Sequence, residues 1–522
     1  MRKKVSIALL LVFMLAFTSV LSGCNTNTNT NTTASTVNTT ANVETTEPAA
    51  PIRDDLNVAL EVPISSLEPT ALMGNGSIVM LKSIYGTLVD LDEEMNVIPS
   101  IAESWTKSED GLTYTFKIRE GIKFSNGDEL TAEDVVFSFE RFLKAPIGLF
   151  YSQYISGASA LDKYTVEVTT PAVFEGIFTA LSTVLLVLPK NYVESMSDDI
   201  SQKAIGSGPY IVKNFVPGSH IDLEANENYF KGAPSIKTIT MKFIPDAGTR
   251  AIALESGEVD LIIVPAFNDR SNLMNLDHIS YLEALSNKRY TISLSDFGIL
   301  KDSKLREAIS YGINNEEIFQ VMTDGIGQVI KGTVSPVAFP QYSDIVAIST
   351  YNPEKAKIAL AESEYDPTSD VVVISVLDPV TQRIAEVIQN QLSQVGIKTQ
   401  IDTIEVGAFY GRIAEGKVEI AISFGGGSVF SPQEELGGFT TMQDRAQRWP
   451  DSQQMDDLYN QLIATADQNQ RTEIIKEMYE VLRDMYLVVA LYVTNEAIAF
   501  DKDLKGIKPH PEGIYIFENA NW

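Results

Sequence analysis

Cysteine and histidine are scarce in this 522-residue chain, which contains one cysteine, Cys24, and three histidines, His220, His278 and His510. A single cysteine excludes an internal disulfide. The histidines are far apart and stand in no metal-ligand spacing. We therefore expect surface or capping roles for them, and no metal held directly by the protein.

Catalytic patterns are missing as well. Few histidines leave few pairs of a nucleophile and a base, and the Gly-Ser-Gly at 206–208 lacks the spacing of a Gly-x-Ser-x-Gly elbow. The glycines at 425–427 are not followed by Gly-Lys-Ser/Thr, which excludes a phosphate-binding loop of that type. We predict that the chain is not an enzyme and needs no cofactor.

Long apolar runs are absent except at the N-terminus. The run at 5–20 follows Arg2, Lys3 and Lys4 and precedes Leu21-Ser22-Gly23-Cys24. It is shorter than the roughly 20 apolar residues that a membrane-spanning helix needs, and its flanks are those of an export signal. The residues before Cys24 resemble a bacterial lipobox, which implies cleavage after residue 23 and acylation of the Cys24 thiol. The alternative is an ordinary secretory signal with a chance cysteine.

The segment 24–51 is rich in Asn and Thr and buries little apolar surface, which predicts a disordered tether. A glycosylated stalk is the alternative. Together these features predict a protein held by a lipid anchor on the outer face of the cell membrane.

Positive charge is in deficit, with 40 basic against 69 acidic residues and a formal net charge of −29. Such a balance opposes nonspecific binding to nucleic acid and to anionic lipid. No fixed-period repeat occurs, which excludes a solenoid or propeller.

The first half of the remaining chain has mixed patterns. Residues 112–119 alternate apolar and polar side chains and predict a strand with one buried face. Thr131, with Asp134 three residues later, predicts the start of a helix. Residues 304–323 predict one long amphipathic helix.

The stretch 352–424 is the most regular part of the sequence. Asn352-Pro353 predicts a helix start, and a helical stripe ends at Gly396. Apolar strands at 371–376, 397–404 and 418–424 are separated by helical patterns. This order predicts a parallel sheet in an α/β lobe.

Several motifs occur in the first half of the chain. They are Ala102-Glu103-Ser104-Trp105, the run from Asp110 to Arg119, Gly121-Ile122-Lys123-Phe124-Ser125-Asn126-Gly127, Thr131-Ala132-Glu133-Asp134-Val135 and Gly206-Ser207-Gly208-Pro209-Tyr210. Together these motifs resemble the family 5 extracellular solute-binding proteins of the peptide/nickel type. The physical pattern of these motifs is that of turns, strands and caps, so we expect structural roles for them, with Trp105 in a core.

The resemblance implies an α/β fold, a bilobal periplasmic-binding-protein-like clamp of the three-domain type. It implies capture of a ligand between two lobes and delivery to an ABC permease and ATPase complex. The predicted division is 1–23 signal peptide, 24–51 tether, 52–85 and 186–282 domain I, 86–185 an inserted α+β domain II, 283–497 domain III, and 498–522 the return to domain I. We expect a monomer.

The resemblance also implies a peptide ligand, but the loop after 418–424 departs from the family pattern. Ser428 stands where an Asp commonly pairs with the amino group of the ligand, and a hydroxyl does not offset a buried ammonium charge. An oligosaccharide, a metal–chelator complex or a sensing role without transport stays open. The predicted ligand contacts are Tyr290, Phe424, Gly425, Gly426, Gly427, Ser428, Arg445 and Trp449.

Overall fold

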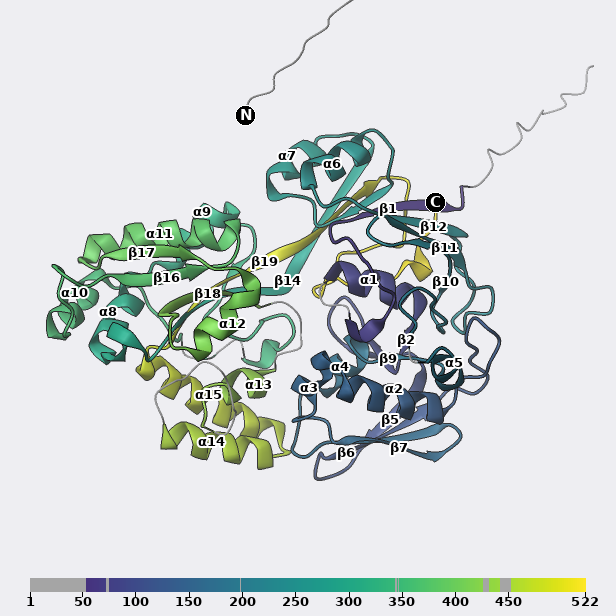
Figure 1. Cartoon of the computed structure of the whole chain (residues 1–522), viewed down its shortest axis with the longest axis horizontal. Helices are drawn as coiled ribbons and strands as arrows, with labels where there is room; N and C mark the ends of the chain where they lie inside the picture. The colour runs from purple at the N-terminus through teal and green to yellow at the C-terminus, as the bar shows by residue number, and fades with distance from the viewer. Residues whose placement is uncertain are drawn as a thin grey trace, which may run out of the picture. The chain divides into compact units, whose positions relative to one another are not determined.

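Two long antiparallel strands, β14 (Ile279–Leu294) and β19 (Val488–Asp501), connect two groups of elements (Figure 1). The computed structural model describes residues 53–71, 75–197, 199–342, 345, 347–425, 431–441 and 452–522. Residues Ile52–Trp522 form one compact unit by themselves. We call the elements from β1 (Asp55–Leu60) to α7 (Arg270–Met274), with the segment after β19, lobe one. Lobe two contains the elements from α8 (Ser303–Gly312) to α15 (Gln468–Met485).

Lobe one contains part of an 11-stranded sheet, in which the order β10-β11-β12-β1-β13-β19 continues through β14 into lobe two. The strands are β1 (Asp55–Leu60), β10 (Tyr210–Val216), β11 (His220–Ala225), β12 (Thr238–Phe243) and β13 (Leu261–Ile263). The helices of this part are α1 (Asn75–Ile84), α5 (Lys190–Ser195), α6 (Ala247–Glu255) and α7 (Arg270–Met274). Short 3-10 turns are η1 (Pro69–Ala71), η2 (Phe267–Asp269) and η5 (Phe517–Asn519).

A second core of lobe one lies around a four-stranded sheet of order β5-β6-β8-β7. Its strands are β5 (Ala102–Lys107), β6 (Thr113–Ile118), β7 (Gly157–Asp162) and β8 (Thr165–Thr169). The helices are α2 (Ala132–Lys144), α3 (Pro146–Tyr151) and α4 (Ile177–Thr183). Two small ladders pair β2 (Gly86–Thr87) with β9 (Leu186–Val187), and β3 (Val89–Leu91) with β4 (Val97–Pro99).

In lobe two the sheet continues from β14 as β18-β16-β17. The strands β16 (Val372–Val376), β17 (Thr399–Thr403) and β18 (Ile420–Gly425) are parallel to one another, which confirms the predicted parallel sheet. One face is covered by α8 (Ser303–Gly312), α9 (Asn315–Thr323), α10 (Pro353–Glu362) and α11 (Pro379–Val395). The turn η3 (Gly298–Lys301), the strand β15 (Gln328–Val329) and α12 (Val406–Ala414) complete this part.

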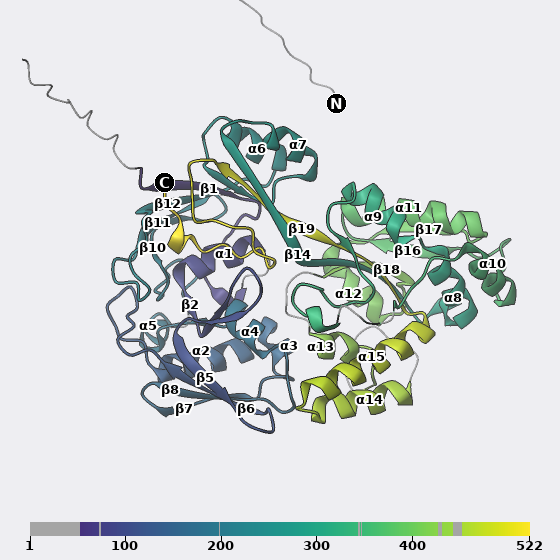
Figure 2. The same ribbon diagram turned by 180° about the vertical axis from the view of Figure 1, so that it is seen from behind.

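A helical layer completes lobe two beside β19 (Figure 2). It contains α13 (Pro432–Gly437), α14 (Gln453–Ala464), α15 (Gln468–Met485) and the turn η4 (Pro340–Tyr342). Its buried residues form one core with Val488, Ala490 and Val493 of β19. Within the described part of the chain, no helix is both long enough and apolar enough to cross a bilayer.

The predicted single helix at 304–323 is wrong, because the chain forms α8 and α9 with a break between them. Ile313 is extended, and Asn314 caps α9 by accepting a hydrogen bond from the Glu317 amide at 3.2 Å. The amphipathic stripe continues across the break, since both helices bury apolar residues in the same core. Periodicity alone therefore did not reveal the cap.

Other predicted helix ends are confirmed. Asp134 accepts hydrogen bonds from the amide and the hydroxyl of Thr131 at 2.9 and 3.0 Å, and so begins α2. Asn352 caps α10, and Gly396 ends α11 with a φ of 99° in the left-handed region that favours glycine.

Two of the motifs have structural roles. Trp105 packs on the rings of Phe116 and Phe178, with centroids 6.4 and 5.6 Å away. A Cβ added to Gly206 would lie 2.1 Å from the backbone oxygen of Ile84 at the end of α1. Glycine is therefore required at position 206 for the close approach of two backbone segments.

Candidate functional site

The crossing between the lobes contains a β-bulge. The register between β14 and β19 shifts between Leu285 and Arg289, so the residues between them lie outside the ladder. Ser286 fixes the bulge by donating from its hydroxyl to the backbone oxygen of Thr494 at 2.8 Å. The bulge places Asn287, Lys288 and Arg289 at the point where the two lobes meet.

Asn287 connects both lobes. Its side-chain amide donates to Glu512, from the segment after β19, and its side-chain oxygen accepts from the Ser335 hydroxyl of lobe two at 2.5 Å. Asn287 and Glu512 are both buried. The Glu512 amide donates to the Nδ1 atom of His510 at 3.1 Å. His510 is buried and accepts this local backbone hydrogen bond, so the capping role holds for it and the surface role does not.

Arg289 is a buried cation at the end of the bulge. It forms an ion pair with Glu435 of α13, and their side chains are 6% and 18% exposed. Burial lowers the pKa of Arg289 to about 10, while Tyr479, Glu434 and Glu512 oppose the change. A Cβ on Gly425 would lie 3.3 Å from the Arg289 guanidinium carbon. The glycine therefore lets the backbone of β18 pass close to this cation.

Glu434 brings a second carboxylate of α13 to the junction. It is fully buried and accepts a hydrogen bond from the backbone amide of Ser431, in a capping box that begins α13. A Cβ on Gly176 of lobe one would lie 3.2 Å from a Glu434 oxygen. Burial, with Glu434 and Glu512 nearby, raises the pKa of Tyr151 in α3 well above its ordinary value. Glu434 of lobe two thus lies against lobe one, beside Gly176.

Lys288 forms the second ion pair of the junction. Its amine lies 2.6 Å from Glu496 of β19, and the two side chains are 14% and 1% exposed. Burial raises the pKa of Glu496, and Lys288 opposes this rise. The charged groups of the junction are therefore held by partners within the chain and largely shielded from bulk water.

The structure brings three of the predicted ligand contacts together beside this junction. The Tyr290 ring packs between Phe424 and Tyr492, with both centroid distances 5.0 Å. Phe424 is half-exposed, and Gly425 pairs with Arg289 in the ladder of β14 and β18. The other predicted contacts lie outside the described residues, as does Cys24; they are Gly426, Gly427, Ser428, Arg445 and Trp449.

Several junction residues were not predicted from the sequence. Arg289 is adjacent to Tyr290, but nothing in the strand pattern marks it as buried. Glu434 has a readable signal, since Ser431-Pro432 followed by Glu434 is a capping box. Glu496 and Glu512 have no local signal, because only the return of the chain to lobe one brings them to the bulge.

A separate contact joins the lobes at Glu175, in the segment between β8 and α4. Its carboxylate accepts from the Tyr342 hydroxyl at 2.7 Å and from the Gln468 amide at 2.8 Å. The Arg471 guanidinium, which is 1% exposed, lies 3.8 Å from the other oxygen. Nearby, the Val173 amide donates to the Ile463 carbonyl at 3.2 Å. We call Glu175, Tyr342, Gln468 and Arg471 the cross-lobe contact.

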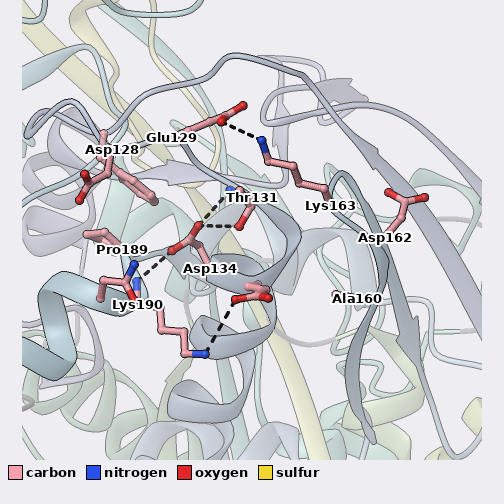
Figure 3. A pocket seen from close by; sticks show the side chains of 12 residues that line it. Asp128, Glu129, Thr131, Asp134, Ala160, Asp162, Lys163, Pro189 and Lys190 are labelled. Carbon is pink, nitrogen blue, oxygen red and sulfur yellow. Dashed lines mark hydrogen bonds and ion pairs between the residues drawn. The ribbon is translucent and has the colours of Figure 1, made fainter.

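An open cavity of about 580 Å³ lies elsewhere on lobe one, at the starts of α2 and α5 (Figure 3). Asp134 accepts there from Thr131 and from the Lys190 amide, and Lys163 pairs with Glu129 at 2.9 Å. These contacts hold helix ends and a turn, which explains the charged groups without a ligand. Among the described residues, no group of three or more His, Cys, Asp or Glu side chains is arranged to hold a metal ion.

Comparison with known proteins places these features in a family. The family model for bacterial extracellular solute-binding proteins, family 5 Middle, matches residues 96–447. The oligopeptide-binding protein AppA of Bacillus subtilis is 28% identical over 462 residues, covering 82% of this chain and 84% of that protein. The heme-binding protein A of Haemophilus influenzae is 26% identical over 439 residues, covering 77% and 80%.

The fold is likewise similar to a solved structure. The structure of AppA from Bacillus subtilis in complex with a nonapeptide has a TM-score of 0.73 and 26% sequence identity. The match covers 90% of this chain and 99% of that one. The resemblance inferred from the motifs and the predicted mixed α/β fold are confirmed.

Proposed function

The chain belongs to the family 5 bacterial extracellular solute-binding proteins, and we propose that it captures a peptide between its two lobes and delivers it to an ABC importer. Its partners are then a membrane permease and its ATPase. We propose no catalytic activity, in keeping with a family of binding proteins.

One observation carries the proposal: buried charged groups from both lobes meet at the bulge of β14. Arg289 of the connecting strand pairs with Glu435 of lobe two, and Asn287 binds Glu512 of lobe one. A ligand that contacts both sides would stabilise the arrangement in which the lobes touch, and only such differential contact shifts a conformational equilibrium. Tyr290 and Phe424 supply aromatic surface beside these groups.

A peptide is the first choice because the oligopeptide-binding relative has a bound nonapeptide in its structure. The heme-binding relative keeps a non-peptide solute open. An oligosaccharide or a metal–chelator complex is therefore the second candidate, and ligand sensing without transport is the third. For the end of β18 and the loop after it we propose ligand contacts at Gly425, Gly426, Gly427 and Ser428. Arg445 and Trp449 complete the proposed set.

We propose that Cys24 carries the lipid anchor and that the segment 24–51 spaces the binding unit from the membrane. In this proposal, domain I comprises 52–85, 186–282 and 498–522, domain II comprises 86–185, and domain III comprises 283–497. Mass spectrometry of the protein from membranes tests the anchor: acylated Cys24 supports it, and a free thiol on a released protein contradicts it.

Thermal unfolding of the unit from Ile52 tests the function against peptides, oligosaccharides and metal–chelator complexes. A ligand at 100 times its Kd adds about 2.7 kcal/mol to the free energy of unfolding. Stabilisation by peptides supports the proposal, whereas stabilisation by sugars or chelates alone replaces the ligand class. Tyr290→Ala should abolish the increase in unfolding temperature that the ligand causes. Tyr365→Ala in lobe two is the matched control and should retain this increase. If no class of solute raises the unfolding temperature, solute capture is refuted.

A further inference from the structure

A second cavity of lobe one lies between α1, the β3–β4 hairpin, α4 and the C-terminal segment, which runs beside α1 (Figure 1). Its volume is about 170 Å³. That is room for about five water molecules and less than a drug-sized ligand needs. None of the described residues proposed to contact the main ligand lines it. The cavity is therefore a separate place, and its size limits a guest to a small molecule.

A buried ion pair lines the inner side of the cavity. The Lys82 amine lies 2.7 Å from Asp90 and donates to the Ser182 carbonyl at 2.7 Å, and the Lys82 and Asp90 side chains are 4% and 7% exposed. These contacts use two of the three N–H donors of an ammonium. Asp90 is better satisfied, because it also accepts from the Thr87 hydroxyl at 2.8 Å and lies 3.2 Å from the Lys231 amine. One donor of Lys82 is thus left for a guest.

Tyr515 supplies a second, independent observation, since it lines the same cavity. The residue is 2% exposed, and its hydroxyl has no hydrogen-bond partner among the described residues. Burial, with Glu496 nearby, raises the pKa of Tyr515 well above its ordinary value, and the His510 backbone opposes the rise, so the hydroxyl keeps its proton. A buried hydroxyl without a partner costs free energy. A guest with an acceptor atom would remove this cost.

Two carboxylates that line the cavity keep capacity to accept hydrogen bonds. Glu518 lies 3.5 Å from the Lys231 amine, and Glu93 lies 3.5 Å from the Lys508 amine. Both contacts are loose, since charge-assisted N–H···O bonds are about 2.7–2.9 Å long. Glu93 and Lys508 are 39% and 67% exposed. The free donors are thus on the buried side of the cavity, and a loosely held acceptor is on the side open to solvent.

The charge of the lining is nearly balanced. The described residues that line the cavity include four carboxylates and three ammonium groups. Burial, with Lys82 nearby, lowers the pKa of His510 to about 4, so the imidazole of this lining residue is neutral near pH 7. Such a balance does not favour a guest with a net negative charge, and an apolar guest would leave the donors of Lys82 and Tyr515 unsatisfied.

We propose that this cavity binds a small zwitterion, such as a free amino acid, with its carboxylate at Lys82 and Tyr515 and its ammonium at Glu93 and Glu518. The carboxylate accepts the free donors of the buried side. The ammonium offers three donors to the loosely held acceptors. This site is additional to the capture of a solute between the lobes and does not depend on it.

Titration calorimetry on the unit from Ile52 tests the ligand class with four small probes. Glycine carries both charged groups, acetate has only the carboxylate, glycinamide has only the ammonium, and glycerol has neither. We expect glycine to bind about ten-fold or more tightly than each of the others, because each of them lacks at least one charged partner. Equal or tighter binding of acetate, glycinamide or glycerol overturns the inference, as does binding of none of the four.

Tyr515→Phe locates the carboxylate end. The substitution removes a hydroxyl that has no partner in the described chain, so the unfolding temperature of the free protein should not fall. The affinity for glycine should fall by about ten-fold. Tyr192→Phe, whose hydroxyl donates to the Lys203 carbonyl at 3.2 Å elsewhere in lobe one, is the matched control and should retain the affinity. Unchanged affinity in Tyr515→Phe overturns the inference.

Glu93→Gln locates the ammonium end and should weaken glycine a few-fold, in the range of exposed ion pairs, without weakening acetate. Glu94→Gln is the matched control, since Glu94 is exposed and does not line the cavity. A Glu93→Gln variant that weakens both probes equally contradicts the proposed orientation. Tyr290→Ala should leave glycine binding unchanged. If Tyr290→Ala abolishes this binding, glycine binds between the lobes, and the inference fails while solute capture stays.

Discussion

The cross-lobe contact at Glu175 predicts that this single carboxylate biases the two lobes toward closure. Glu175 belongs to lobe one, whereas its partners Tyr342, Gln468 and Arg471 belong to lobe two. Arg471 keeps its hydrogen bonds to Leu462 and Gln433 when the lobes separate, because those residues are in lobe two as well. Opening therefore removes the contacts to Glu175 and the neighbouring hydrogen bond from the Val173 amide to the Ile463 carbonyl.

Glu175→Gln tests this bias with little change of shape. Hydrogen bonds to charged groups contribute about 1.5–3 kcal/mol each, and the amide retains one acceptor oxygen. We expect the closed arrangement to lose about 1.5 kcal/mol relative to the open one, roughly a ten-fold change in their ratio. The apparent affinity for any ligand that requires closure should fall by no more than the same factor.

Distance measurements between spin labels would follow the ratio directly. The unit from Ile52 contains no cysteine, so cysteines placed at the exposed positions Glu109 and Glu473 accept labels on opposite lobes. Glu175→Gln should move population toward longer distances in the ligand-free protein, while Glu194→Gln, an exposed glutamate of lobe one, should not. An unchanged distribution in Glu175→Gln would refute the assignment of this contact as a closing element.

Three further predictions concern stability, each measured by denaturant unfolding. Burial lowers the pKa of His510 from 6.5 to about 4. The unfolded chain therefore takes up a proton at this residue before the folded chain does. The free energy of unfolding should be unaffected by His510 above pH 6.5 and should fall by about 3 kcal/mol toward pH 4. His510→Gln should flatten this slope, and an unchanged slope would contradict a buried neutral imidazole. Asp90→Asn should cost about 3–5 kcal/mol, because Lys82, 2.7 Å from Asp90 and 4% exposed, loses its buried partner; a change below 1 kcal/mol, within the range of surface pairs, would refute this. Gly206→Ala should cost more than about 2 kcal/mol, since a Cβ would meet the Ile84 oxygen, whereas Gly218→Ala, with open space around its Cβ, should be affected only by its φ of 73°.

Much of the fold was predictable because its signals are local. The α2 cap depends on Thr131 and Asp134, three residues apart, and the end of α11 depends on the conformational freedom of Gly396. The parallel strands of lobe two follow from alternating strand and helix patterns. The wrong prediction at 304–323 also involves local signals. The continuous apolar stripe indicated one helix, whereas the cap at Asn314 begins a second one.

The site was less predictable because its residues meet only after folding. Glu512 reaches Asn287 across more than two hundred residues of sequence, and Glu496 reaches Lys288 across a similar separation. Their burial depends on a bulge that no composition or periodicity reveals. Tyr290 and Phe424 were found through register in the strands, and the structure brings them into contact. Arg289, one residue away, was missed, since a charged residue in a strand is ordinarily expected on the exposed face.

The pairing of β14 with β19 determines how the two lobes can move relative to one another. The connection between the lobes is a two-stranded ribbon whose hydrogen bonds run into both lobes, interrupted only at the bulge and beside Tyr290. Such a ribbon resists stretching, because extension would break the ladder, but two-stranded ribbons twist more than wider sheets. The ribbon should therefore twist most easily at Ser286–Lys288, where the ladder is interrupted. The lobes should separate by rotation about this section, with little change in their spacing along the strands.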